Sequence, residues 1–270
     1  MSTPSDFDPA EALAKINTKV PHPARVWDYW LGGKDHFAAD REAGEHLLAA
    51  MPSWVEVARA DREFLARAVR YLVEEAGIRQ FLDIGTGIPT ANNTHEVAQS
   101  IAPESRIVYV DNDPIVLVHA RALLTSTPEG ATAYIDADLR EPEGILERAR
   151  LTLDFDRPIA ITLLAIMEFI IDDGEAQAIL KRLMDAVPSG SYLAIAQPVH
   201  SEAIDEAAQR WNDSGGTTVS GRHPEQIAAF FAGLDLVEPG VVALPRWRPD
   251  AATSYTDRDI PSFCGVARKP

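Results

Sequence analysis

The sequence contains a single cysteine, Cys264, so the chain cannot form a disulfide within itself. That content agrees with a reducing cytoplasm. No apolar run approaches the roughly 18 to 20 residues that a membrane-spanning helix needs. The longest, residues 159–171, is interrupted by Thr162 and Glu168, and residues 1–11 lack the basic and apolar segments of a secretory signal. We therefore expect a cytoplasmic protein with no membrane partner.

Basic residues are few relative to acidic ones. Lys and Arg number 25 against 41 Asp and Glu, which gives a formal net charge of −16. A chain this acidic repels phosphate backbones unless it carries a local basic patch, and its Lys and Arg residues are scattered. His, Cys and carboxylate residues form no dense group with the spacing of a metal site. The sequence therefore predicts no nucleic-acid partner and no bound metal.

Beyond residue 77, strand-like and helix-like patterns alternate. Repeated units of this length are typical of a parallel sheet with helices on both faces. Strands are predicted at 81–84, 106–110, 132–135, 159–164 and 191–196, helices near 90–101, 114–125, 142–150 and 175–186, later helices at 201–211 and 224–231, and late strands at 234–237 and 263–267.

The first 76 residues predict a loose tail followed by three helices. The tail covers residues 1–18, two helices lie within 25–50 on either side of Gly32 and Gly33, and the third occupies 53–77. We therefore expect an α/β fold with an N-terminal helical extension. Its tail and helical lid would cover residues 1–76, and one compact ligand-binding domain would cover residues 77–270.

A glycine-rich turn follows the first predicted strand of the alternating region, with Gly85, Thr86 and Gly87 at its centre. Glycines allow a tight turn and let a ligand approach the backbone, at the strand edge where open α/β sheets bind ligands. A dinucleotide site needs a third glycine where this chain has Thr90. An S-adenosylmethionine site has an acid two residues before the first glycine, and Asp83 supplies it. The turn therefore favours S-adenosylmethionine, with a purely structural turn as the alternative.

Acidic residues also follow the second and third predicted strands. Asp111 ends the second strand, where a carboxylate can accept two hydrogen bonds from ribose hydroxyls. Alternatively, Asp111 or Asp113 caps the helix that begins at Pro114, and Asp113 fits that cap better. Asp138 follows the third strand and is placed to accept a hydrogen bond from an adenine amino group. With Asp83, these acids mark the carboxyl ends of three successive strands, which favours one ligand site over three unrelated caps.

These motifs, together with residues 24–37, 40–42 and 188–193, resemble class I S-adenosylmethionine-dependent methyltransferases. More narrowly, the chain resembles the bacterial S-adenosyl methyltransferase family, formerly DUF574, over about residues 18–269. The resemblance implies a Rossmann-like, seven-stranded, mostly parallel sheet whose last strand is antiparallel. It also implies cofactor contacts at Asn112 and Leu139. The predicted cofactor-binding residues are therefore Asp83, Gly85, Thr86, Gly87, Asp111, Asn112, Asp138 and Leu139.

Aromatic rings, glycines and charges gather shortly before residue 38 and predict a lid over the cofactor. The residues expected to close over the cofactor and line the acceptor pocket are Tyr29, Trp30, Gly33, Lys34, His36 and Phe37. The alternative is that Trp27, Trp30 and Phe37 anchor the added helices in the core.

Two positions depart from the pattern of the resembled family. Pro89 stands where the glycine-rich motif has its third glycine, and Glu168 follows the fourth strand where family members often carry a histidine. A carboxylate there lies near the expected methyl group and could act as a base, especially with a pKa raised by burial. It could equally orient a bound amine or be a solvated loop acid.

The leading hypothesis is an S-adenosylmethionine-dependent methyltransferase that acts on a small molecule. Methyl transfer from a sulfonium mainly requires positioning and desolvation, so no fixed catalytic triad is expected. The second hypothesis is a protein that binds S-adenosylmethionine or S-adenosylhomocysteine without transfer activity. A nicotinamide-dependent oxidoreductase is a third, disfavoured by Thr90. The sequence leaves a homo-oligomer open.

Overall fold

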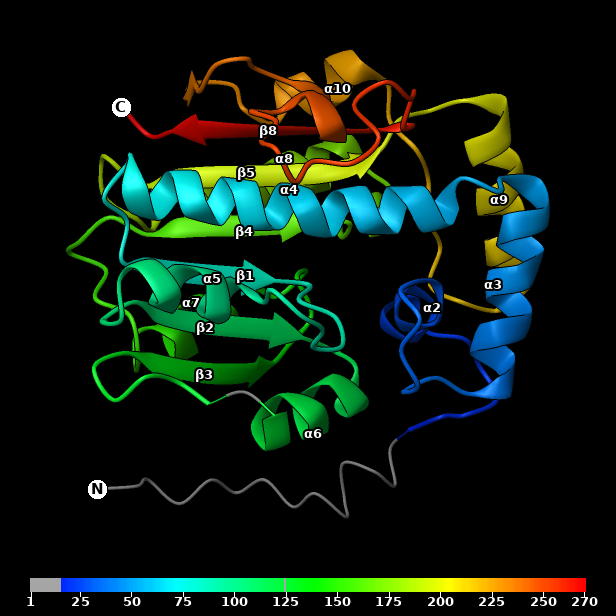
Figure 1. Cartoon of the computed structure of the whole chain (residues 1–270), viewed down its shortest axis with the longest axis horizontal. Helices are drawn as coiled ribbons and strands as arrows, with labels where there is room; N and C mark the ends of the chain where they lie inside the picture. Colours follow the sequence, from blue (N-terminus) through cyan, green and yellow to red (C-terminus); the bar gives the residue numbers. More distant parts are fainter. Residues whose placement is uncertain (1–15, 124) are drawn as a thin grey trace.

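One sheet runs through the protein in the strand order β3-β2-β1-β4-β5-β8-β6, with β7 paired to β8 (Figure 1). The computed structural model describes residues 16–123 and 125–270, so most of the predicted tail lies outside the described residues. The strands are β1 (Gln80–Ile84), β2 (Arg106–Asp111), β3 (Ala131–Asp136), β4 (Ala160–Leu164), β5 (Tyr192–Pro198), β6 (Asp235–Leu236), β7 (Val242–Ala243) and β8 (Ser262–Arg268).

Strands β1 to β5 are parallel, and the long final strand β8 is antiparallel to β5. β1 lies between β2 and β4, with Ile84 opposite Val110 on one side and near Leu163 on the other. The strand order therefore reverses direction at β1, which is the switch point where α/β sheets bind ligands. The predicted Rossmann-like sheet with an antiparallel last strand is confirmed, and the two-residue β7 is an addition to it.

Helices cover both faces of the sheet because successive strand residues are buried on opposite sides. Phe81 belongs to a core with α4, whereas Leu82 belongs to a core with α7 and α8. Figure 1 shows α4 crossing one face of the sheet. The helices are α2 (Pro23–Trp30), α3 (Ala38–Ala50), α4 (Trp54–Glu74), α5 (Thr94–Ile101), α6 (Pro114–Leu123), α7 (Pro142–Ala149), α8 (Asp173–Asp185), α9 (Glu202–Asp213) and α10 (Pro224–Ala229).

The N-terminal helices lie beyond the carboxyl ends of the strands. In Figure 1 the arrowheads of β1 to β5 point towards α2, α3 and α9, and α3 packs against both α2 and α9. The predicted break between the first two helices is confirmed, with Gly32 at a φ of +82° that favours glycine. This arrangement places α2 over the edge of the sheet where a ligand is expected.

Buried charges attach α2 to that edge. Arg25 Nε lies 3.2 Å from Asp113 Oδ2 and 3.6 Å from Asp40 Oδ1, and all three side chains are buried. His22 Nδ1 also lies 3.0 Å from Asp113 Oδ2. Because Asp113 immediately precedes α6 and Asp40 belongs to α3, these ion pairs fix α2 between the sheet and the outer helices. Within residues 16–123 and 125–270, no helix is both long and apolar enough to cross a membrane.

Candidate functional site

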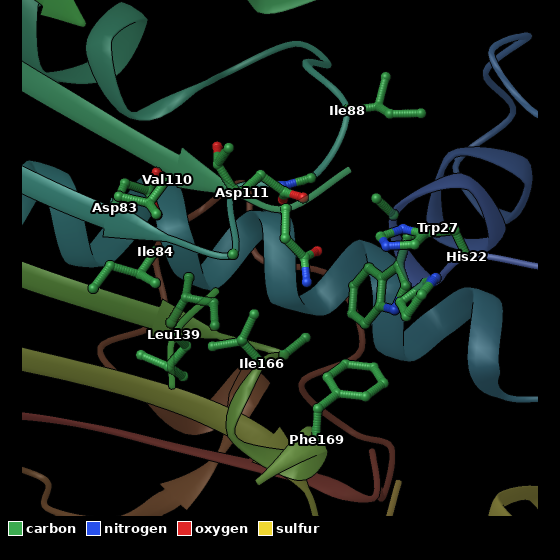
Figure 2. Close-up of a pocket in the computed structure, with 18 of the residues that line it drawn as sticks. His22, Trp27, Asp83, Ile84, Ile88, Val110, Asp111, Leu139, Ile166 and Phe169 are labelled. Atoms are coloured by element: carbon green, nitrogen blue, oxygen red, sulfur yellow. The ribbon is translucent and has the colours of Figure 1, made fainter. Parts of the chain in front are cut away.

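A cavity opens where β1, β2 and β4 end, facing α2 and α4; we call it the strand-end cavity (Figure 2). All the predicted cofactor-binding residues line it: Asp83, Gly85, Thr86, Gly87, Asp111, Asn112, Asp138 and Leu139. They come from three successive strand ends, as the sequence predicts. Cofactor binding by these eight residues stays a prediction.

The glycine-rich turn requires glycine at both central positions. Gly85 has a φ of +76° and Gly87 a φ of +66°, a region that side chains with a Cβ rarely adopt. A Cβ on Gly85 would also lie 2.5 Å from Cδ1 of Ile166, whereas one on Gly87 would meet nothing within 4 Å. The turn therefore packs closely against the chain after β4 at Gly85 and stays open at Gly87.

Asp83 connects three elements behind the turn. Its carboxylate accepts hydrogen bonds from Thr94 Oγ1 at 2.6 Å and Thr162 Oγ1 at 2.7 Å. Burial raises the pKa of Asp83, and the two hydroxyl donors oppose that rise. Asp83 thus lines the cavity while tying β1 to α5 and β4.

Asp111 and Asp113 have the separate roles that the sequence suggests. Asp113 Oδ1 accepts a hydrogen bond from the backbone N–H of Ile115 at 3.0 Å, which caps α6. Asp111 instead lines the cavity, where Oδ2 accepts from Gly87 N at 2.8 Å and Oδ1 accepts from Asp113 N at 2.9 Å. Each of these oxygens keeps a further lone pair for a ligand.

The loop after β3 combines an apolar and a charged side chain. Leu139 is buried, and Asp138 is partly exposed beside the guanidinium of Arg140 at 3.4 Å. Arg140 Nη2 also donates to the carbonyl of Phe169 at 2.6 Å. The loop after β3 is thereby joined to the turn after β4, on the opposite side of β1.

Two neighbouring charges on α4 complete the cavity and were not predicted. Asp61 is 6% exposed, and burial raises its pKa to about 7, with the charge of Arg62 opposing this and that of Asp83 adding to it. Arg62 Nη2 donates to the carbonyls of Ala91 and Asn92 at 3.1 Å each. Its buried Nε has no hydrogen-bond partner among the described residues. A guanidinium and a carboxyl group thus stand side by side in the wall.

The sequence does carry a signal that Asp61 is buried. It falls in the apolar stripe of α4, between Val57 and Phe64 at helical spacing, and all three side chains are buried. Charged residues are almost never buried unless they are paired or functional.

The predicted lid residues do not line this cavity. In the described part of the chain, the cavity wall contributed by α2 and the residue after it includes Pro23, Trp27 and Leu31, and excludes Tyr29 and Trp30. The rings of Trp30 and Trp54 stack at 5.3 Å, and Tyr29 packs edge-on against His36. The lining predicted for Tyr29, Trp30, Gly33, Lys34, His36 and Phe37 is therefore not found at this cavity, and their role as a lid stays a prediction. Trp30 is buried in the helical core, as the alternative has it, and also lines a second cavity beside α9, whereas Trp27 lines both cavities.

Glu168 lies in the short turn Met167–Phe169 after β4, but it lines a different cavity. That second space, which we call the tryptophan cavity, is bordered by α2, α4, α9 and this turn. Glu168 is 4% exposed, and burial raises its pKa to about 8. The predicted position after the fourth strand is correct, and its role as a base stays a prediction. Across the described ranges, no group of three or more His, Cys, Asp or Glu side chains could hold a metal.

Comparisons with known proteins identify the family of the chain. A family model for S-adenosyl methyltransferases matches residues 9–270. A DUF574 family protein from Streptomyces avermitilis is 48% identical, with a TM-score of 0.90 over 94% of this chain and 99% of that one. A candidate methyltransferase from Thermobifida fusca is 39% identical, with a TM-score of 0.86 over 98% of this chain and 99% of that one.

A more distant structure shares the fold. Magnesium protoporphyrin IX methyltransferase from Synechocystis, solved with bound S-adenosylhomocysteine, is 11% identical, with a TM-score of 0.54 over 91% of this chain and 93% of that one. The comparison with curated proteins found no match.

Proposed function

Because the chain belongs to the S-adenosyl methyltransferase family, we propose that it binds S-adenosylmethionine in the strand-end cavity and transfers the methyl group to a small-molecule acceptor. The single observation that carries this proposal is the match between the polar groups of the cavity and the separate parts of the cofactor. Those parts are a ribose, an adenine, a zwitterionic amino acid and a sulfonium.

The ribose would bind at Asp111. Its two carboxylate oxygens are held in place by the N–H groups of Gly87 and Asp113, so the side chain needs no rearrangement to accept hydroxyl donors. Asn112 follows it at the cavity wall. A carboxylate that ends the second strand is suited to a ribose diol because both hydroxyls can donate to one anion.

The adenine would bind at the loop after β3. Leu139 offers a buried apolar surface for a flat ring, and Asp138 offers an acceptor for an exocyclic amino group. Asp138 is held by Arg140 and is partly exposed, so it can accept a donor without first losing a buried partner.

The amino-acid end would bind at Asp61 and Arg62. A zwitterion carries an ammonium and a carboxylate on one carbon, and these adjacent side chains present the complementary charges. The buried, unpartnered Nε of Arg62 gives the cavity a donor that a carboxylate can satisfy. This fit supports a cofactor with an amino-acid end over a simple nucleotide.

The cavity also suits a cation. Five carboxylates line it (Asp28, Asp61, Asp83, Asp111 and Asp138) against His22, Arg62 and Arg140. The cofactor supplies an activated methyl group on a positively charged sulfur. The role of the protein is then to hold the acceptor in line with that group and to exclude water from it.

One observation favours a second function, cofactor binding without transfer. Glu168, the predicted base, lines the tryptophan cavity and not the strand-end cavity within the described residues. If Glu168 is the base that transfer needs, its place outside the strand-end cavity would leave the cofactor bound and protonated acceptors unchanged.

Two measurements separate these functions. Calorimetry with S-adenosylhomocysteine tests the site, and incubation of a small-molecule extract with methyl-labelled S-adenosylmethionine tests transfer. We expect binding and a labelled small molecule. Binding without label would favour the second function, and a folded protein that binds no S-adenosylhomocysteine would contradict both.

A further inference from the structure

The tryptophan cavity has an apolar, aromatic wall. Its aromatic side chains are Trp27, Trp30, Trp54, Phe169 and Trp211, and aliphatic groups such as Ile204 and Val219 fill the space between them. The wall is drawn from α2 and α9, which lie beyond the strand ends (Figure 1), and from Trp54 at the start of α4. An aromatic wall of this kind binds a flat hydrocarbon body, and it attracts cations to the ring faces.

Glu168 brings a carboxyl group into this wall, and one of its two oxygens has no partner among the described residues. This oxygen, Oε2, is buried. The neighbouring carboxylate of Asp61 carries the same sign of charge and raises the pKa of Glu168 further, after burial, the largest cause. A buried carboxyl oxygen without a donor is costly, which gives the cavity a preference for a ligand that can supply one.

The nearest cation does not neutralise Glu168. Arg222 Nη1 donates to the carbonyl of Met167 at 2.7 Å, Nη2 donates to that of Ile170, and Nε pairs with Asp173 at 2.8 Å. These contacts use the guanidinium to hold the turn that carries Glu168. Several influences act on the pKa of Glu168, and the charge of Arg222, which lowers it, is the smallest of those named.

The tryptophan cavity adjoins the strand-end cavity. Pro23, Trp27 and Phe169 line both, so two aromatic rings form the wall between them. Figure 2 shows Trp27 and Phe169 on the same side of the strand-end cavity, away from Asp83. A molecule in the tryptophan cavity would therefore lie next to a cofactor bound at the strand ends.

We propose that the tryptophan cavity is the acceptor site, and that the acceptor is an amine with a flat apolar body whose ammonium group is bound by Glu168. The assignment of this ligand as the methyl acceptor rests on the function proposed above. Its nitrogen would accept the methyl group only after the ammonium loses a proton, which the Glu168 carboxylate can take, and the cofactor would leave as the neutral thioether. The aromatic side chains bury the body, and the carboxylate pairs with the ammonium, since a buried cation needs an anion or hydrogen-bond acceptors beside it. An uncharged isostere lacks that pairing and binds more weakly.

The test uses one pair of probes that differ only in charge. 2-Phenylethylamine and 2-phenylethanol share a body, and the full chain without cofactor is titrated with each at about pH 8. Tryptophan emission reports binding, because four of the tryptophans line this cavity. We expect the amine to bind at least about tenfold more tightly than the alcohol, and Glu168→Gln to abolish that ratio.

A filling substitution and its control keep the test independent of Glu168. Ala208 lines the cavity from α9, so Ala208→Phe is expected to block both probes while S-adenosylhomocysteine still binds. Gln209 is exposed on the same helix, and Gln209→Phe is expected to change neither. Circular dichroism confirms that each variant is folded.

The probe experiment tests the amine specificity separately from the proposed function. Equal binding of the two probes, no binding of either, or a ratio that survives Glu168→Gln would overturn the amine specificity. If the amine preference holds but S-adenosylhomocysteine does not bind, the acceptor assignment falls with the proposed function and the amine specificity of the cavity stands.

Discussion

The carboxylate of Asp111 accepts a hydrogen bond from the backbone N–H of Gly87 at 2.8 Å. This bond joins the end of β2 to the turn after β1, across neighbouring strands. The acid therefore shapes the glycine-rich turn before any ligand arrives, and the same carboxylate faces the strand-end cavity. The shape of the turn and the proposed recognition of a ligand therefore depend on the same side chain.

Substituting Asp111 should weaken cofactor binding strongly. Asp111→Asn keeps one oxygen for the turn but loses the charge and an acceptor for a ribose diol, so we expect the Kd for S-adenosylhomocysteine to rise at least about tenfold. The control is Asp136→Asn, since Asp136 pairs with Asp111 in the sheet register and is exposed. If calorimetry shows that both variants bind S-adenosylhomocysteine equally well, Asp111 is not part of the binding site.

Arg62 should discriminate ligands by their amino-acid end. We expect Arg62→Gln to weaken S-adenosylhomocysteine about tenfold to a hundredfold, because a charge-assisted hydrogen bond is lost. Binding of 5′-methylthioadenosine, which lacks the amino acid, should change little. Arg59→Gln on the exposed face of α4 serves as the control. A parallel loss for both ligands would mean that Arg62 only supports the turn carbonyls that it contacts.

Two half-buried aromatic residues of α2 should differ in effect. Trp27 lines the strand-end cavity, whereas Tyr29 packs against α3, where its hydroxyl lies 3.4 Å from Glu45 Oε1. We expect Trp27→Ala to weaken S-adenosylhomocysteine about tenfold and Tyr29→Ala to leave its Kd within about twofold. Calorimetry that shows the larger loss for Tyr29→Ala would restore the lid predicted from the sequence.

The stability of the protein should fall with rising pH through Glu168. Its pKa is raised from 4.5 to about 8 in the folded chain, so the folded state holds a proton that the unfolded state has lost between those values. That stabilising contribution is complete below about pH 4.5 and disappears as the pH rises through about 8. Thermal unfolding from pH 5 to 9 should show a smaller decline of Tm in Glu168→Gln. Parallel curves for the two proteins would contradict the raised pKa.

The alternation of strands and helices was predictable because it is a local pattern. β1, β2, β4 and β5 are apolar segments bounded by turn residues, and the helix that begins at Pro114 carries proline at its start. The antiparallel final strand followed from family resemblance. The two-residue β7 was missed because a pairing with β8 that short has no periodicity of its own.

The acids at the strand ends were predictable for a related reason. Parallel strands end at one edge, so Asp83, Asp111 and Asp138 had to come together once the strands were assigned. Asp61 and Arg62 were missed because they reach the cavity only through the packing of α4 on the sheet. Sequence spacing does not say where a helix preceding the first strand will lie.

The two sides of α2 could not be told apart for a similar reason. Pro23 and Trp27 lie four residues apart and line the strand-end cavity, whereas Trp30 stacks on Trp54 at the tryptophan cavity. Both sides carry aromatic rings, so composition alone gave no basis for choosing between them.

The aromatic wall shared by Trp27 and Phe169 makes the two cavities a linked pair. Any displacement of these rings by one ligand changes the space left for the other. By thermodynamic reciprocity, the factor by which a cofactor alters acceptor affinity equals the factor by which an acceptor alters cofactor affinity. In the proposed function, these two side chains would couple the affinities for cofactor and acceptor, which is heterotropic cooperativity within a single chain.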